Sequence, residues 1–281
     1  MNFDLLKPLL FLLLCCSSCF AQEIPQIDWQ ELSKTEPWKA TEQWTPVPAI
    51  VTPSSATSAP SDAIVLFDGT STDAWIKSNL GYGANMEQFE AIVNHRNSGN
   101  LGTIKPAGWK IESGAMVVVP GSGAIETKQS FGDVQLHIEW LAPEDPGKSD
   151  QAYSNSGVFL MGQYEIQVLN SYENKTYPNG QAGSLYKQHI PLVNASLPPG
   201  QWQSYDIFFT APRFDDAGSL VSPARMTALH NGILIHHNVE LTGPTIYIGK
   251  PHYVAHKDKL PIVLQDHGDK VRFRNIWVRE L

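Results

Sequence analysis

Hydrophobic and polar residues alternate along most of the chain after about residue 63, with the period of two that is typical of β-strands. In the run DVQLHIEWL (133–141) every second residue is apolar, and the residues between them are Gln135, His137 and Glu139. Because successive side chains of a strand point to opposite faces, one face of this run belongs in a hydrophobic core and the other face is polar.

Further runs rich in β-branched and aromatic residues predict strands at 115–120, 156–161, 164–169, 203–209, 224–238, 244–249, 261–265 and 270–281. Asn231-Gly232 inside one of these runs is a strong signal for a two-residue hairpin turn. No helical period extends beyond three turns, and Asn79–Lys110 is expected to be an irregular surface segment. The pattern therefore predicts an all-β fold, an antiparallel sandwich or jelly roll.

Four of the predicted strands have a polar face made of Gln, Glu, His or Arg. These faces hold Gln135, His137 and Glu139; Gln163, Glu165 and Gln167; Gln265 and His267; and Arg272 and Arg274. Such side chains donate and accept hydrogen bonds in fixed directions, as sugar hydroxyl groups require. Each face alone is typical of a solvated sheet, but if all four form the concave side of one sheet, they converge on a single cleft.

The N-terminal segment is typical of a secretory signal. Met1–Ala21 carries Lys7, the apolar run Leu9–Leu14 and then small residues, and the apolar run is too short for a lasting membrane span. Cleavage after Ala21 and lipid modification of Cys19 are both compatible with it. We expect an exported protein, located in a bacterial periplasm, on the outer membrane as a lipoprotein, or outside the cell.

Residues 22–62 are expected to form an extended segment that includes the Pro-, Ser- and Thr-rich linker Pro46–Asp62, and residues 63–281 to form the ordered domain. All three cysteines lie in the predicted signal, so we expect no disulfide in the mature protein. The net charge of -8 disfavours non-specific binding of nucleic acid, which depends on Lys and Arg.

Several motifs in order resemble the 3-keto-disaccharide hydrolase family, also described as 3-keto-glucoside 1,2-lyase and 3-keto-2-hydroxyglucal hydratase domains. They are SNSGVFLMGQYEIQVLNSYENKTY (154–177), NGQAGSLYKQHIPLVNAS (179–196), PGQWQSYDIFFTAPRF (199–214) and IVLQDHGDKVRFRNIWVREL (262–281). With LFDGTSTDAW and FGDVQLHIEW, the resemblance covers roughly Ala63–Leu281. It implies a concanavalin-like jelly-roll sandwich of two antiparallel sheets and a 3-keto-glucoside as substrate.

The residues that fit the family pattern are Glu139, Glu165, Gln167, Tyr186, Gln265, His267, Arg274 and Asn275. The chain departs from it at two positions. Many relatives carry Arg where this chain has Met161, and Asp where it has Asn170, so any role of those two polar groups in substrate binding is in doubt here.

The implied activity is an elimination. A ketone at C3 acidifies the hydrogen on C2, so a base can remove that proton and the enolate can expel the group on C1; water can then add to the unsaturated sugar. We predict that Glu139 or His267 transfers the protons, with Glu165 as the other candidate. The predicted substrate-binding residues are His137, Gln167, Tyr186, Gln265, Arg274 and Asn275.

Simpler interpretations remain open at this stage. Glu139 and Arg274 could form only a cross-strand ion pair, and His267 could be only a turn residue. A conventional glycoside hydrolase would use Glu139 and Glu165 as its two carboxyl groups. A carbohydrate-binding sandwich without catalysis, or a structural envelope protein, are further alternatives, but the ionisable groups on strand faces favour an enzyme.

No cofactor is firmly expected. A divalent ion bound by His137, Glu139 and His267 is conceivable, because carboxylate and imidazole groups suit several divalent metals. His252 and His256 are four residues apart, but no helix is predicted around them and the chain lacks a metalloprotease motif.

Overall fold

The computed structural model describes residues 28–55, 58–78, 83–99 and 103–281. The chain divides into two compact units, one ending at Ile50 and the other spanning Val51–Leu281. The first unit contains the short helices α1 (Trp29–Thr35) and η1 (Pro37–Thr41). The predicted secretory signal and Cys19 lie outside the described residues.

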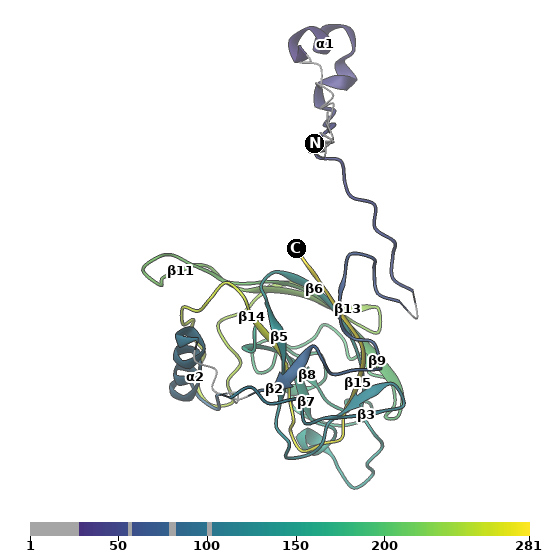
Figure 1. Ribbon diagram of the computed structural model, residues 1–281, viewed down its shortest axis with the longest axis vertical. Helices are drawn as coiled ribbons and strands as arrows, with labels where there is room; N and C mark the ends of the chain where they lie inside the picture. Colours follow the sequence, from purple (N-terminus) through teal and green to yellow (C-terminus); the bar gives the residue numbers. More distant parts are fainter. Residues whose placement is uncertain (1–27, 56–57, 79–82, 100–102) are drawn as a thin grey trace, which may run out of the picture. The chain divides into compact units, whose positions relative to one another are not determined.

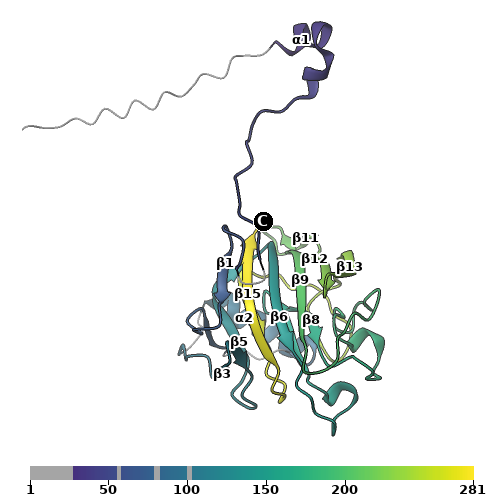
Figure 2. The same cartoon turned by 90° about the vertical axis from the view of Figure 1, so that its right-hand side faces the viewer.

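The second unit is built on two antiparallel sheets. In the described part of the chain the larger sheet has eight strands, in the order β13-β12-β9-β6-β15-β4-β3 with β1 also paired to β15. Figure 2 shows β15 between β1 and β6. The strands are β1 (Ile64–Phe67), β3 (Lys110–Glu112), β4 (Ala115–Val117), β6 (Val134–Leu141), β9 (Trp202–Thr210), β12 (Arg225–His230), β13 (Ile233–Glu240) and β15 (Arg272–Glu280).

The smaller sheet has five strands among the described residues, in the order β2-β5-β14-β7-β8. They are β2 (Trp75–Lys77), β5 (Ile125–Phe131), β7 (Ser156–Leu160), β8 (Tyr164–Val168) and β14 (Leu260–Leu264). A two-stranded ribbon joins β10 (Arg213–Phe214) to β11 (Leu220–Ser222), and two short 3-10 helices, η2 (Asp150–Ala152) and η3 (Pro178–Gly180), lie in the loops.

The core lies between the inner faces of these two sheets. Alternate residues of β6 from Val134 to Trp140 are fully buried in it, and Ile166 of β8 and Leu264 of β14 belong to the same cluster. The other parity of each strand faces outward, as a half-buried strand requires. The predicted all-β sandwich of two antiparallel sheets is confirmed.

The predicted hairpin at Asn231-Gly232 is present. Both residues have positive φ angles, 52° and 76°, as the tightest hairpin turns require, and they join β12 to β13. The predicted strand at 244–249 is wrong, because this segment is irregular. Its backbone instead bonds to two different neighbours, through Thr245 N to Gln163 O and Ile248 N to Ala84 O, so it does not follow either sheet.

A helix that the alternation did not predict, α2 (Met86–Ser98), lies in the segment expected to be irregular (Figure 1). Asn85 caps its start by accepting a hydrogen bond from Gln88 N, and Gly99 ends it with a left-handed φ of 73°. Only two apolar residues of the helix, Phe89 and Val93, are buried in its contact with Ile246. The helical period of hydrophobic residues in this segment is therefore weak. No helix in the described ranges is long and apolar enough to cross a membrane.

Candidate active site

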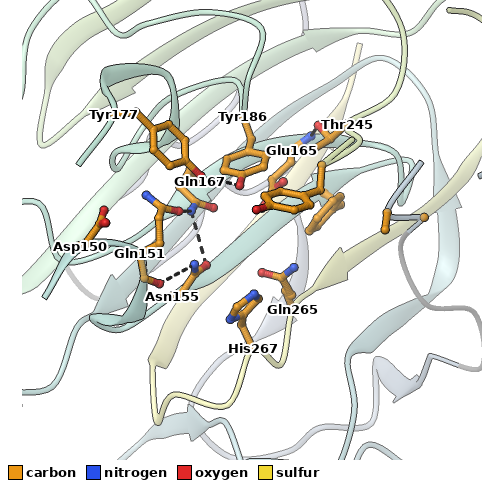
Figure 3. Close-up of a pocket in the computed structure, with 14 residues that line it drawn as sticks. Asp150, Gln151, Asn155, Glu165, Gln167, Tyr177, Tyr186, Thr245, Gln265 and His267 are labelled. Atoms are coloured by element: carbon orange, nitrogen blue, oxygen red, sulfur yellow. Dashed lines mark hydrogen bonds between the residues drawn. The ribbon is translucent and has the colours of Figure 1, made fainter. Parts of the chain in front are cut away.

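A cavity of about 590 Å³ opens on the outward face of the five-stranded sheet (Figure 3). Its lining comes from β7, β8, the end of β14 and the surrounding loops. The lining residues are Gly83, Ala84, Asp150, Gln151, Asn155, Phe159, Glu165, Gln167, Tyr177, Tyr186, Thr245, Tyr247, Gln265 and His267. Five predicted site residues are among them, namely Glu165, Gln167, Tyr186, Gln265 and His267.

Glu165 lies on the floor of this pocket and is only 5% exposed. Gly157 on the neighbouring strand makes room for it, because a Cβ at that position would lie 2.3 Å from Glu165 Oε1. Burial raises the pKa of Glu165 to about 8. The site therefore holds a carboxyl group that is a stronger base than an ordinary glutamate once it is ionised.

Amide side chains surround the carboxyl group. The side-chain amide of Gln167 is assigned in the orientation that gives both its oxygen and its nitrogen suitable hydrogen-bond partners. In this orientation the nitrogen donates to Glu165 Oε1 at 3.0 Å and to the Ser156 carbonyl oxygen at 2.9 Å. Gln265, which follows β14, is 5% exposed, and its Oε1 has no hydrogen-bond partner among the described residues. A buried acceptor without a partner is costly, so this oxygen is suited to a ligand hydroxyl group.

The turn that follows β14 presents His267 at the pocket edge, where its side chain is exposed. Two aspartates hold this turn. Asp266 Oδ2 accepts from Gly123 N at 2.9 Å, and Asp269 Oδ2 accepts from Asn155 N at 2.8 Å, while Asp269 also pairs with Lys148. His267 is thus both a turn residue and a pocket residue.

Three tyrosines form one side of the pocket. Tyr177 Oη and Tyr186 Oη are 2.6 Å apart, and the Nζ atom of Lys187 lies 3.9 Å from the centre of the Tyr247 ring. Burial raises the pKa of Tyr186, so its hydroxyl group stays neutral. The pocket thus combines an aromatic side with a polar floor, as sites that bind sugars often do.

The four remaining predicted site residues lie on the other sheet. His137 and Glu139 are on β6, and Arg274 and Asn275 are on β15. The prediction that one cleft joins them to the pocket residues is wrong, because β6 and β15 belong to the eight-stranded sheet, whereas β8 and β14 belong to the five-stranded sheet. The pairing of strands, which the alternation does not specify, separates the two groups.

These four residues form their own hydrogen-bond network with Asp206. Arg274 Nε donates to Glu139 Oε2 at 2.6 Å, and Asn275 Nδ2 donates to Glu139 Oε1 at 2.8 Å. His137 Nδ1 lies 2.7 Å from Asp206 Oδ1. The cross-strand ion pair of Glu139 and Arg274, one of the simpler interpretations, is therefore present.

The network also shifts the pKa values of its members. Burial by itself lowers the pKa of His137, but the hydrogen bonds to Asp206 and Glu139 and their charges outweigh it and raise the pKa to about 9. Burial by itself raises the pKa of Glu139, but its hydrogen-bond donors outweigh it and lower the pKa to about 2. Glu139 is thus a weak base held by a cation, which suits a structural role better than proton abstraction.

The ligand set conceived for a divalent ion does not assemble, because His267 lies in the turn after β14 at the edge of the pocket, whereas His137 and Glu139 are on β6 of the eight-stranded sheet. Across the described ranges, no group of three or more His, Cys, Asp or Glu side chains is arranged to hold a metal ion. His252 and His256 contact different residues. His252 Nε2 lies 3.2 Å from Glu90 Oε1, and His256 Nε2 lies 2.9 Å from the Tyr164 hydroxyl group.

The alternation of residues did not identify the pocket residues that come from loops. They are Gly83, Ala84, Asp150, Gln151, Asn155, Tyr177, Thr245 and Tyr247. A period of two carries no information about such residues, although Tyr177 lies within a motif that resembles the family. Met161 and Asn170 do not line the pocket; Met161 is buried in the core and Asn170 accepts a hydrogen bond from Tyr172 N in a turn.

A jelly-roll sandwich with a polar and aromatic pocket on one outer face is typical of carbohydrate-active proteins. Residues 62–279 match the family described as the 3-keto-alpha-glucoside-1,2-lyase-like domain, so the chain belongs to this family of carbohydrate-active enzymes. The predicted family resemblance is confirmed. The family implies a carbohydrate substrate.

Solved structures agree with this assignment. A protein of Parabacteroides distasonis ATCC 8503, described as a candidate glycosyl hydrolase, is 41% identical and superposes with a TM-score of 0.75, covering 86% of this chain and 96% of its own. A second protein of the same organism and description is 17% identical, with a TM-score of 0.50 and coverage of 78% and 94%, and supports the fold alone. No curated protein matches the chain.

Proposed function

We propose that this protein cleaves 3-keto-glucosides by removing the C2 proton and eliminating the group on C1, with Glu165 as the base. The observation that carries the proposal is the buried carboxyl group of Glu165 on the pocket floor, with its pKa raised to about 8. Removal of a proton next to a ketone needs a base whose pKa is near the working pH. Family membership supplies the class of substrate.

Other pocket groups support the remaining steps. His267 is at the open edge of the cavity, where a leaving oxygen would face solvent, and its imidazole is suited to protonate that oxygen. The free acceptor of Gln265 and the amide of Gln167 would bind sugar hydroxyl groups. Water that enters after the alcohol leaves would hydrate the unsaturated sugar, which gives net hydrolysis.

A conventional glycosidase mechanism through Glu139 and Glu165 is not supported. Such enzymes place two carboxyl groups on either side of one glycosidic bond, roughly 5 to 9.5 Å apart. The two glutamates are on the outer faces of different sheets, with the core of the sandwich between them. No substrate bond can lie between them.

We also propose that the protein acts after export, in the periplasm, as an outer-membrane lipoprotein or outside the cell. The support is the composition of residues 1–21, which is typical of a secretory signal. Fractionation of the native cells, with detection of the protein by antibody, tests it; a protein confined to the cytoplasm would contradict this location.

Two matched variants test the role of Glu165. Glu165→Gln keeps the size of the side chain but cannot accept the C2 proton, so we expect kcat for a 3-keto-glucoside to fall by a factor of about 100 to 10,000. Glu139→Gln makes the same change on the other sheet, and we expect kcat to stay within about threefold. The measurement is release of the alcohol from both anomers of a 3-keto-glucoside.

Equal turnover by Glu165→Gln and the wild type would refute the assignment of the base. A large loss of kcat in Glu139→Gln with an unchanged melting temperature would indicate that the hydrogen-bond network on the eight-stranded sheet is catalytic.

A further inference from the structure

The proposed elimination builds negative charge on the C3 oxygen of the sugar, and this oxygen needs a partner that stabilises the charge. Arg274, a cation among the predicted substrate-binding residues, is on the other sheet. Among the described residues that line the pocket, none is Arg or Lys. An enolate oxygen in such a site needs a positioned hydrogen-bond donor, because that interaction strengthens as charge develops.

Within the described ranges, the hydroxyl groups of Tyr177 and Tyr186 hydrogen-bond only to each other. The hydroxyl groups of Tyr177 and Tyr186 are 2.6 Å apart and share one hydrogen bond. Each phenol has one proton, so when one hydroxyl group donates to the other, the accepting group keeps its own proton for a third partner. A hydroxyl group that accepts a hydrogen bond is also a better donor, because the two bonds polarise each other.

Of the two tyrosines, Tyr186 is the one whose backbone is hydrogen-bonded to the proposed base, Glu165. Its backbone N–H donates to the carbonyl oxygen of Glu165 at 3.4 Å, so the segment that carries Tyr186 runs beside β8. Figure 3 shows the Tyr186 ring between Tyr177 and Glu165, with all three facing the cavity. A donor and a base that face one cavity from adjacent backbone positions can act on adjacent atoms of one ligand.

Lys187 adds positive charge behind the pair. Its Nζ atom lies 5.9 Å from the centre of the Tyr177 ring and 5.8 Å from that of Tyr186. Its ammonium group donates to the Tyr247 carbonyl oxygen at 2.8 Å, which fixes its place beside the aromatic side of the pocket. A cation there favours charge on an oxygen bound to the pair.

We propose that Tyr186 is a catalytic residue that donates a hydrogen bond to the C3 oxygen of the substrate, and that Tyr177 is a positioning residue that donates to Tyr186. The inference rests on the proposed function. In the first step the C2–H pair forms the C2=C3 bond, the carbonyl π pair moves to the oxygen held by Tyr186, and Glu165 takes the proton. In the second step the carbonyl re-forms, C1=C2 forms, and the C1–O bond breaks while His267 protonates the leaving oxygen.

The first step can be measured apart from the second. The 3-keto derivative of 1,5-anhydroglucitol has the ketone but no exocyclic group at C1 to expel, so an enolate formed by loss of the C2 proton can return by taking up deuterium from D2O at C2; exchange at C4, the other carbon next to the ketone, is followed separately. We expect the wild type to catalyse the exchange at C2, as followed by NMR, and Tyr186→Phe to slow it by about 100-fold, the usual effect of losing one such donor. Tyr172→Phe is the matched control, since Tyr172 does not line the pocket.

A positioning role for Tyr177 has its own signature. Tyr177→Phe should lower kcat for exchange by about tenfold while KM for the ketone and the melting temperature stay unchanged. Incorporation of 3,5-difluorotyrosine at position 186 keeps the ring and the hydroxyl group, and should retain exchange where Phe does not. A purely structural tyrosine would show no such difference between the two replacements at equal melting temperature.

The possible results separate this inference from the proposed function. If the wild type exchanges and cleaves, and Tyr186→Phe exchanges at the wild-type rate, the inference is overturned and the function stands. If Tyr186→Phe loses cleavage but keeps exchange, Tyr186 acts on the leaving group and the inference is again overturned. A wild type that neither exchanges this ketone nor cleaves 3-keto-glucosides overturns both.

Discussion

Glu165 owes its position to Gly157, which lies diagonally across from it on the neighbouring strand β7. Gly157 has no side chain, and the space that a Cβ would fill is occupied by the Glu165 carboxylate. The carboxyl group is thereby held below the level of the pocket surface, where burial raises its pKa to about 8. The neutral form is favoured at rest, and Gln167 is placed to donate to the ionised form.

This raised pKa predicts a pH dependence of stability. A group whose pKa rises on folding, here from 4.5 to about 8, stabilises the folded state fully below pH 4.5, and this contribution is lost as the pH rises through 8. For the wild type we expect the free energy of unfolding to fall by on the order of 4 kcal/mol over this window. Urea unfolding at pH 5, 7 and 9 measures it.

Glu165→Gln is the control for that measurement, because it cannot ionise. We expect it to be more stable than the wild type at pH 9 and to lack most of the decline. Parallel curves for the two proteins between pH 5 and 9 would mean that the carboxyl group titrates normally.

At the scale of the strands, the same alternation produces two different outer faces. On β6 and β15 the outward residues bind one another, so that Glu139 and Arg274 complete a satisfied network. On β8 and after β14 the outward residues line a cavity, and Gln265 Oε1 has no hydrogen-bond partner in the part of the chain that the structure describes. A face whose polar groups satisfy each other stabilises the sheet, whereas a face with unpaired groups is available to a ligand.

The network on β6 and β15 predicts a stability effect without a catalytic one. Glu139→Gln removes a charge-assisted pair and should cost about 1 to 3 kcal/mol at pH 7. Because the pKa of Glu139 is lowered to about 2, its contribution is present above pH 4.5 and is lost as the pH falls through 2. The difference in unfolding free energy between variant and wild type should therefore shrink between pH 5 and pH 2.5; a constant difference would show that packing is responsible.

The alternation of residues could predict which side chains of each strand face outward, and it did so for β6, β8 and β15. It could not predict which strands share a sheet. β6 pairs with β9 and β15 across long stretches of sequence, and those pairings depend on the packing of the whole core. Helix α2 was missed for a related reason, since its evidence lies in the caps at Asn85 and Gly99 more than in its period.

At the scale of the whole domain, the two outer faces of the sandwich have different roles, one in stability and one in the proposed reaction. The core joins the two sheets, one outer face carries the ion-pair network, and the other carries the pocket, which Thr245, Tyr247 and two residues before α2, Gly83 and Ala84, also line. The loop residues Asp150, Tyr177 and Tyr247 reach the pocket only because the fold brings distant segments together. Five of the nine site residues predicted from the sequence line this pocket, but the sequence did not identify these three.

The measurement that tests the central claim most directly compares two substrates that differ only at C3. The purified protein is incubated with a p-nitrophenyl glucoside and with its 3-keto derivative, each as both anomers, and release of nitrophenol is followed together with the unsaturated 3-keto sugar. We predict release from a 3-keto derivative and none above background from the unoxidised glucosides, because only the ketone acidifies the C2 hydrogen. Release from the unoxidised glucosides at a comparable rate, or from none of the four compounds, would contradict it.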